Sequence, residues 1–145
     1  MYTYKFEKIL TIKEKEKNDA RAKYNDAQKS FEQVAEKLYN LLKKKEELID
    51  FQQKKLSTGL SVQDIRHNQL FMDNLEKLID QCQKEVIQAR NKMNLQQERL
   101  KEKNIEMKKY EKIKEKDLQK YLEVVKVAEN KQMDEISIQQ FLSKG

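Results

Sequence analysis

The sequence predicts an all-α protein, a long antiparallel two-helix coiled-coil hairpin with an overhanging C-terminal helix. Three observations predict this fold. Apolar residues recur at heptad spacing in both halves of the chain, the 145 residues include no proline, and the only internal glycine is Gly59. A heptad repeat sustained over many turns of a polar sequence is typical of a coiled-coil seam.

The composition suits a pair of helices better than a compact domain. Charged residues make up 39% of the chain and hydrophobic residues 37%, and tryptophan is absent. That balance leaves too little apolar surface for a thick core, and a two-helix coil does not need one. Disorder is the competing interpretation, but it predicts no seam period, so we expect it mainly at the chain ends.

The first helix is expected over about 3–56. Its apolar seam repeats at alternating spacings of four and three residues, which is the spacing of heptad a and d positions. The seam residues are Ala20, Tyr24, Ala27, Phe31, Val34, Leu38, Leu41, Lys45 and Leu48.

A turn is expected at 57–61, followed by a second helix over about 62–132. Gly59 tolerates the left-handed conformation that closes a helix. Ser61 is a good N-cap residue, and Asp64 places a carboxylate in the first turn of the next helix. Adjacent stop and start signals predict a helical hairpin.

In an antiparallel hairpin the numbers of two facing seam residues add up to a constant. A sum of 120 brings the seam of the second helix opposite that of the first. Its heptad series reads Ile65, Met72, Ile79, Val86, Met93, Leu100, Met107, Lys114, Tyr121 and Ala128. In this register large side chains face small ones, as close packing requires. The predicted core comprises Phe31, Val34, Leu38, Ile79, Val86, Met93 and Leu100.

Two pairs of facing residues fit poorly in this register. Lys45 faces Leu75, which is tolerable because a lysine stem can lie along an apolar surface while its ammonium stays in water. Lys17 faces Lys103, and two like charges do not attract. The register near the open end of the hairpin is therefore expected to shift or splay.

The second helix extends beyond its partner from about Glu115, yet its apolar residues continue. Such a stripe costs free energy in water and marks an interaction surface. Its occupant is either a different protein or a second copy of the chain. The segment 133–145 either extends this helix or docks separately as a short tail. The predicted binding residues are Leu118, Tyr121, Leu122, Val125 and Ala128.

The sequence offers no catalytic or metal-binding constellation. His67 and Cys82 are the only histidine and the only cysteine, so we expect no metal pair, no Cys-His dyad and no intrachain disulfide. Glycine-rich phosphate loops and serine-centred elbows are also absent. We therefore expect no enzyme and no cofactor.

The net charge of +6 and a pI near 9.2 raise the question of nucleic-acid binding. Opposite charges alternate along the helices and arginine is scarce, so we expect no nucleic-acid partner. No apolar stretch approaches the roughly 20 residues of a membrane span, and the N-terminus lacks the apolar core of a signal peptide. A cytoplasmic protein without direct membrane insertion is expected.

The sequence also resembles the FliJ family of flagellar export proteins over nearly its whole length. The resemblance is carried by Leu56-Ser57-Thr58-Gly59-Leu60-Ser61 at the turn, by Gln69-Leu70-Phe71-Met72-Asp73-Asn74-Leu75-Glu76-Lys77-Leu78-Ile79, and by Met133-Asp134-Glu135. The first two segments are its most specific parts.

The resemblance implies a noncatalytic component of the bacterial flagellar type III export apparatus, peripherally associated with the inner membrane at the flagellar base. Members of this family look like the central stalk of rotary ATPases. They are expected to bind and activate the hexameric export ATPase through the open end of the hairpin and to contact the cytoplasmic domain of the export gate. The alternative is a chaperone-like adaptor that escorts export substrates or their chaperones.

The resemblance also places the gate-binding positions in the middle of the hairpin. Three of them depart from the family in type, because Lys37 and Lys44 replace an uncharged polar and an aromatic residue and Cys82 replaces a histidine. In the heptad frame, Lys37, Lys44, Phe71 and Leu78 are g positions, whose edges adjoin in an antiparallel pair. The full set is Lys37, Leu41, Lys44, Leu48, Phe71, Leu75, Leu78 and Cys82.

Overall fold

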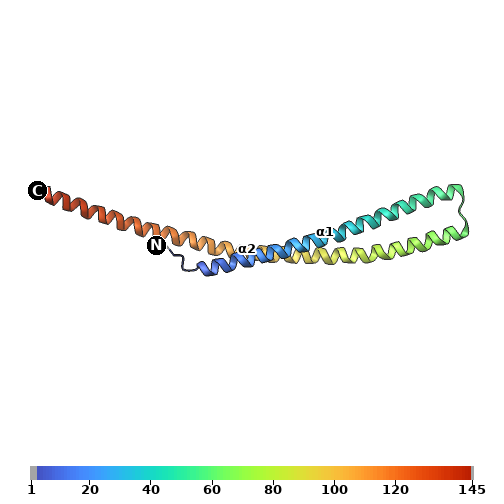
Figure 1. Cartoon of the computed structure of the whole chain (residues 1–145), viewed down its shortest axis with the longest axis horizontal. Helices are drawn as coiled ribbons and strands as arrows, with labels where there is room; N and C mark the ends of the chain where they lie inside the picture. Colours follow the sequence, from blue (N-terminus) through green and yellow to red (C-terminus); the bar gives the residue numbers. More distant parts are fainter. Residues whose placement is uncertain (1–2, 145) are drawn as a thin grey trace. The chain divides into compact units, whose positions relative to one another are not determined.

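The computed structural model describes residues 3–144 and contains two α-helices (Figure 1). Helix α1 spans Glu7–Thr58 and helix α2 spans Val62–Lys144. The helices pack antiparallel, and no strand occurs within the described residues. The prediction of an all-α antiparallel hairpin is thereby confirmed.

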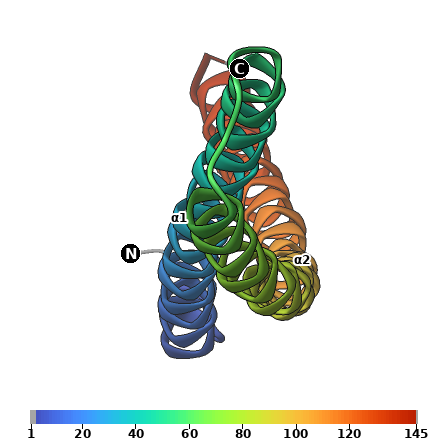
Figure 2. The same ribbon diagram turned by 90° about the vertical axis from the view of Figure 1, so that its right-hand side faces the viewer.

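The connection between the helices uses the residues that the sequence singled out. Figure 2 shows it as a thin trace that leaves the end of α1 and enters α2. Gly59 has a φ of 89°, which is the left-handed region that glycine tolerates. The Ser61 hydroxyl accepts a hydrogen bond from the Asp64 amide at 3.1 Å and so caps α2.

Helix α1 begins at Glu7 instead of near residue 3, where the sequence predicted its start. The chain turns before the helix, with the Glu7 amide donating to the Tyr4 carbonyl at 3.2 Å. The turn lets the Tyr4 side chain become buried, with 5% of its surface exposed. Long-range packing of one aromatic ring therefore overrides the helical propensity of the first residues.

Helix α2 continues to Lys144 instead of ending near 132, so the expected tail 133–145 is helical as far as the structure describes it. Between 62 and 144 the sequence contains neither glycine nor proline, and nothing else stops the helix.

Tertiary contacts divide the chain into two compact units. We call Ala20–Leu100 the tip unit because it contains the turn, and Met1–Asp19 with Lys101–Gly145 the terminal unit. In each unit a part of α1 packs against a part of α2.

The tip unit is held together by the predicted seam. Cys82 is its most buried residue, 1% exposed, and its thiol donates to the Val34 carbonyl at 3.6 Å. Phe31, Val34 and Leu38 of α1 are half-buried. Met93 and Leu100 are also half-buried. The other buried residues are Ala20, Ala27, Met72, Leu75, Ile79 and Val86.

The terminal unit has a small aromatic core in place of a regular seam. Tyr4, Leu10 and Met107 are buried, and Phe6 and Tyr110 pack against them. The Tyr4 hydroxyl donates to the Tyr110 carbonyl at 3.2 Å, and the Tyr4 and Phe6 rings meet edge to face with centroids 5.8 Å apart. This cluster, which we call the aromatic clasp, attaches the start of α1 to α2.

The backbone conformation of Gly59 predicts how much a substitution there would destabilise the protein. Gly59→Ala should lower the free energy of unfolding by about 1–2 kcal/mol, because a Cβ disfavours the left-handed conformation. The added methyl group would meet no atom within 4 Å, so the loss would come from the backbone alone. Urea denaturation measures it.

Gly59→Asn is the matched control, since asparagine tolerates the left-handed region better than alanine. Equal losses for the two variants would contradict the backbone explanation.

Candidate functional site

Four of the expected gate-contacting residues lie exposed along one edge of the tip unit. Phe71 is 56% exposed and Leu78 is 50% exposed, although both are large and apolar. Lys37 and Lys44 are exposed on α1. The Lys37 ammonium lies 3.7 Å from the Glu85 carboxylate, which shows that these edges of α1 and α2 adjoin. We call Lys37, Lys44, Phe71 and Leu78 the gate face.

The other four expected gate-contacting residues face the partner helix. Leu75 is 4% exposed and Cys82 is 1% exposed, while Leu41 and Leu48 are half-buried. The structure therefore separates the eight positions into four that can touch a partner directly and four that pack beneath them. Their positions in the seam explain the difference, because a and d side chains point at the facing helix.

A shallow hollow on α1 adds polar residues that the sequence reasoning missed. Three of its lining residues belong to the expected gate-contacting set. The others lie three or four residues away on the same side of the helix, so helical spacing alone could have predicted them. The hollow is lined by Gln33, Glu36, Lys37, Asn40, Leu41 and Lys44.

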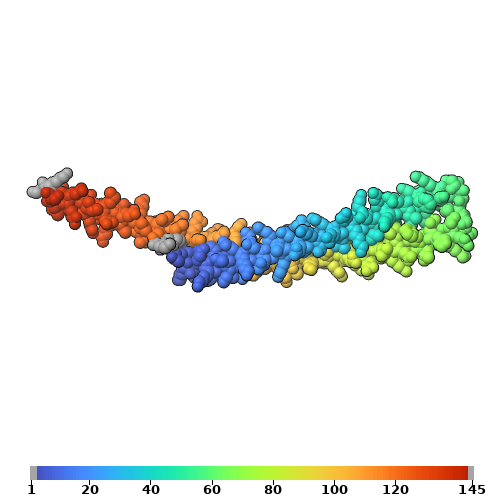
Figure 3. Space-filling view, viewed as in Figure 1, coloured from blue at the N-terminus to red at the C-terminus, as the bar shows by residue number. Residues whose placement is uncertain are grey.

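In the terminal unit, the part of α2 beyond Lys116 presents apolar side chains to solvent. Leu118 and Tyr121 are 36% and 37% exposed, Leu122 is 55% exposed, Ala128 is exposed, and Val125 is half-buried. Figure 3 shows the red end of α2 with no other segment over the visible face. Further exposed apolar residues are Val124, Val127, Met133, Ile136, Ile138, Phe141 and Leu142.

The exposed apolar surface is longer than the sequence reasoning expected. The predicted stripe ended at Ala128, and the sequence left open whether 133–145 extends the helix or docks separately. The observed helix carries Ile136, Phe141 and Leu142 on its surface as well. We call residues 117–144 of α2 the overhang.

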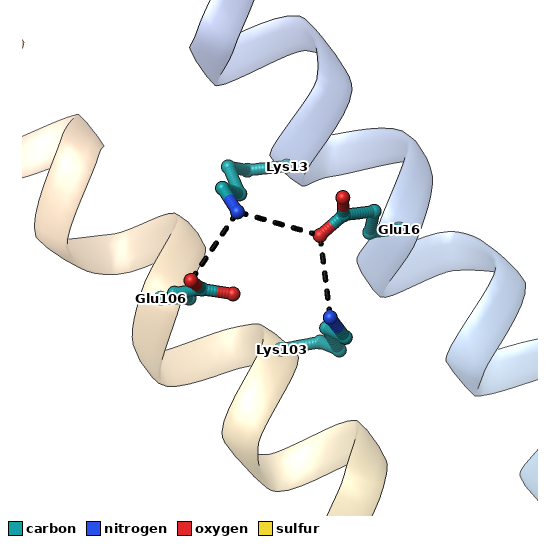
Figure 4. Close-up of polar contacts among 4 residues, drawn as sticks. All are labelled: Lys13, Glu16, Lys103 and Glu106. Atoms are coloured by element: carbon teal, nitrogen blue, oxygen red, sulfur yellow. Dashed lines mark hydrogen bonds and ion pairs between the residues drawn. The ribbon is translucent and has the colours of Figure 1, made fainter.

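The poorly fitting lysine layer is replaced by an ionic network that joins the helices of the terminal unit (Figure 4). The Lys13 ammonium lies 3.2 Å from the Glu106 carboxylate and 3.6 Å from Glu16, and the Lys103 ammonium lies 3.4 Å from Glu16. Lys103 thus pairs with Glu16 although the predicted register placed Lys17 opposite it.

The network also changes the pKa of Lys13. The hydrogen bond to Glu106 is the main reason that the pKa of Lys13 is raised above its ordinary value. A raised lysine pKa stabilises the folded state at neutral pH, and this contribution is lost only as the pH rises through the folded-state pKa.

The described residues contain no group of three or more His, Cys, Asp and Glu side chains that could hold a metal ion. His67 is exposed near the turn, whereas Cys82 is buried in the seam, so they form no dyad. Within residues 3–144, neither helix has a stretch apolar enough to cross a membrane.

Known proteins resemble this chain both in sequence and in structure. The family model described as flagellar FliJ protein matches residues 2–145. The flagellar FliJ protein of Bacillus subtilis (strain 168) is 48% identical over 144 residues, covering 99% of this chain and 98% of the relative. The structure of a putative YscO homologue from Chlamydia trachomatis is similar with a TM-score of 0.66 at 19% identity, covering 99% of this chain and 96% of that one. At that identity the likeness shows a shared fold alone.

The ionic network predicts that the terminal unit responds to salt more strongly than the tip unit. Its charged side chains are partly exposed, so dissolved ions screen their attraction. The tip unit also has the pairs Lys37–Glu85 and Lys45–Glu76, but its helices are held mainly by buried apolar side chains, which salt does not screen. We expect backbone hydrogen exchange at residues 7–19 to accelerate between low and molar salt, while exchange along residues 72–86 changes little. Mass spectrometry of exchanged peptides measures both.

Glu106→Gln should reduce this salt response because Lys13 loses its nearest carboxylate partner. Glu14→Gln, at an exposed position of α1, is the control and should leave the response unchanged. Equal acceleration of both units would show that the network does not hold α1 in place.

Proposed function

Because the chain belongs to the flagellar FliJ family, whose members are noncatalytic components of the export apparatus, we propose that it is the stalk of that apparatus. In this role the overhang binds and activates the hexameric export ATPase. The gate face contacts the cytoplasmic domain of the membrane export gate. The chain would work in the cytoplasm, at the inner membrane beneath the flagellum.

The observation that carries this proposal is the exposed apolar surface of the overhang. Each square ångström of apolar surface left in water costs about 25 cal/mol, and a contiguous patch usually marks an interaction site. The helix itself is complete without that surface, because its backbone hydrogen bonds are internal. A partner that buries the overhang would recover the lost free energy.

The distribution of the apolar residues favours a partner that surrounds the helix. Val127 follows Leu118 by nine residues, which is about two and a half turns, so the two side chains lie on opposite sides. Both are exposed, at 66% and 36%. A second parallel helix would bury only one stripe, whereas a ring of subunits would contact several sides of the overhang.

The gate face supports the second half of the proposal. Phe71 and Leu78 are apolar side chains that folding leaves about half exposed, and aromatic residues of this kind are common at the centre of protein interfaces. Lys37 and Lys44 add basic groups at the same edge. The buried Leu75 and Cys82 would support the backbone beneath this face without touching the gate.

Truncation after Lys116 tests the role of the overhang. The shortened chain should keep its helical circular dichroism, since the aromatic clasp and the tip-unit seam remain, but should lose activation of the export ATPase in a phosphate-release assay. Truncation after Gln132 is the control and should retain most of the activation, because it keeps Leu118 to Ala128.

Full activation by the chain truncated after Lys116 would refute the stalk role. If the full-length chain bound export chaperones in the same preparation but never the ATPase, the adaptor function would be the better explanation.

Phe71→Ala tests the gate face. It should weaken binding to the cytoplasmic domain of the gate about tenfold or more, as for an interface hot spot. Thermal stability should change little, because more than half of the side chain is already exposed. Calorimetry of binding and of unfolding gives the two values.

Leu75→Ala is the informative comparison. This side chain is 4% exposed, so its truncation should cost about 2–5 kcal/mol of stability. If the Phe71→Ala and Leu75→Ala proteins lost the same amount of thermal stability, Phe71 would belong to the core and the gate face would be misassigned.

A further inference from the structure

We propose that the tip unit carries a second docking surface, on the edge opposite the gate face, that accepts a basic amphipathic helix of a partner protein. This surface, which we call the acidic edge, is built on an apolar column whose three large side chains remain exposed after folding. The proposal does not depend on the stalk role. The column consists of Ala35, Leu42, Ile49 and Leu56.

The column runs beside the seam of α1 from Ala35 to Leu56, whereas the equivalent positions earlier in the helix are Arg21 and Gln28. Its members are seven residues apart, and each directly follows a d position of the heptad. Leu42 is 39% exposed, Ile49 is 37% exposed and Leu56 is 66% exposed, with Tyr39 beside them at 66%. In a two-stranded coil the e positions usually carry charges. A helix with a third apolar column is typical of one that packs against two neighbours.

Contacts within the tip unit place this column away from the gate face. The pair formed by Lys37 and Glu85 lies on the edge that carries Phe71 and Leu78. The residues that follow the d positions lie on the other edge of an antiparallel pair. Glu76 is such a residue on α2, and its carboxylate reaches across to within 3.7 Å of the Lys45 ammonium.

The acidic edge has the opposite charge to the chain as a whole. The full sequence carries a net charge of +6. Around Leu42 and Ile49, however, the exposed charged residues at the e and b positions of both helices are mostly carboxylates. Lys45 reaches this edge from the seam and contacts Glu76, which is still 51% exposed. Arg66 and Arg90 lie toward the two ends. The carboxylates are Glu32, Glu46, Asp73, Glu76 and Asp80.

These features together specify the occupant. Apolar residues at a strict interval of seven match the side chains of a helix that lies along α1, which would supply its own apolar residues every three or four positions. The flanking carboxylates favour lysine and arginine on the borders of that helix and repel acidic ones. The same carboxylates repel phosphates, which rules out a nucleic-acid backbone as the occupant.

The test uses two synthetic peptides of equal length and identical apolar positions at heptad spacing. One carries lysine at the flanking positions and the other carries glutamate, and each has a fluorescent label. Titration with the full-length chain should raise the fluorescence anisotropy of the lysine peptide. The glutamate peptide should bind at least about tenfold more weakly.

Substitutions on the two edges locate the binding site. Leu42→Ser combined with Ile49→Ser should weaken binding of the lysine peptide about tenfold, whereas Phe71→Ser with Leu78→Ser should change it less than about twofold. Asp73→Asn with Asp80→Asn leaves every apolar contact intact, so it keeps the test valid if the serine variant is poorly folded. It should weaken binding and flatten its salt dependence.

Three outcomes would overturn the proposal. The first is equal binding of both peptides, and the second is equal loss of binding from substitutions on either edge. The third is sedimentation showing that the chain alone dimerises and that Leu42→Ser abolishes the dimer. In that case the acidic edge is occupied by a second copy of the chain.

Discussion

The seam between α1 and α2 is the interaction on which every other feature of the molecule depends. Met72, Ile79, Cys82 and Val86 are buried there against half-buried side chains of α1. Two helices in contact enclose only this one narrow interior, so an apolar residue away from the seam necessarily meets solvent. Exposed apolar columns in such a protein are therefore informative, because folding does not account for them.

The two units achieve the same helix pairing by different physical means. The tip unit relies on volume complementarity, in which a small residue such as Ala27 or Cys82 is almost completely buried between larger neighbours. The terminal unit relies on the aromatic clasp and on paired charges between Lys13 and Glu106. Partly exposed ion pairs contribute little each. Among the described residues, three of these pairs join the helices of the terminal unit and two join those of the tip unit, so we expect helix pairing in the terminal unit to depend more on salt.

Much of this architecture was predictable because its determinants are local or periodic. The heptad series and Gly59 predicted the hairpin, and the heptad frame predicted that Phe71 would be exposed. The burial of Tyr4 was not predictable, because it depends on a contact with Tyr110, more than a hundred residues away in sequence. The pairing of Lys103 with Glu16 was missed for a related reason, since long charged side chains can choose among several partners near the seam.

The surfaces away from the seam differ in charge as well as in position, and that difference bears on how one hairpin can serve several partners. The gate face combines Phe71 with the basic Lys37 and Lys44, whereas the acidic edge surrounds Leu42 and Ile49 with carboxylates. A helix suited to one of these proposed sites would meet like charges at the other, so the two sites would select against each other's ligands. Because folding buries neither edge, both can be occupied without any rearrangement of the seam between them.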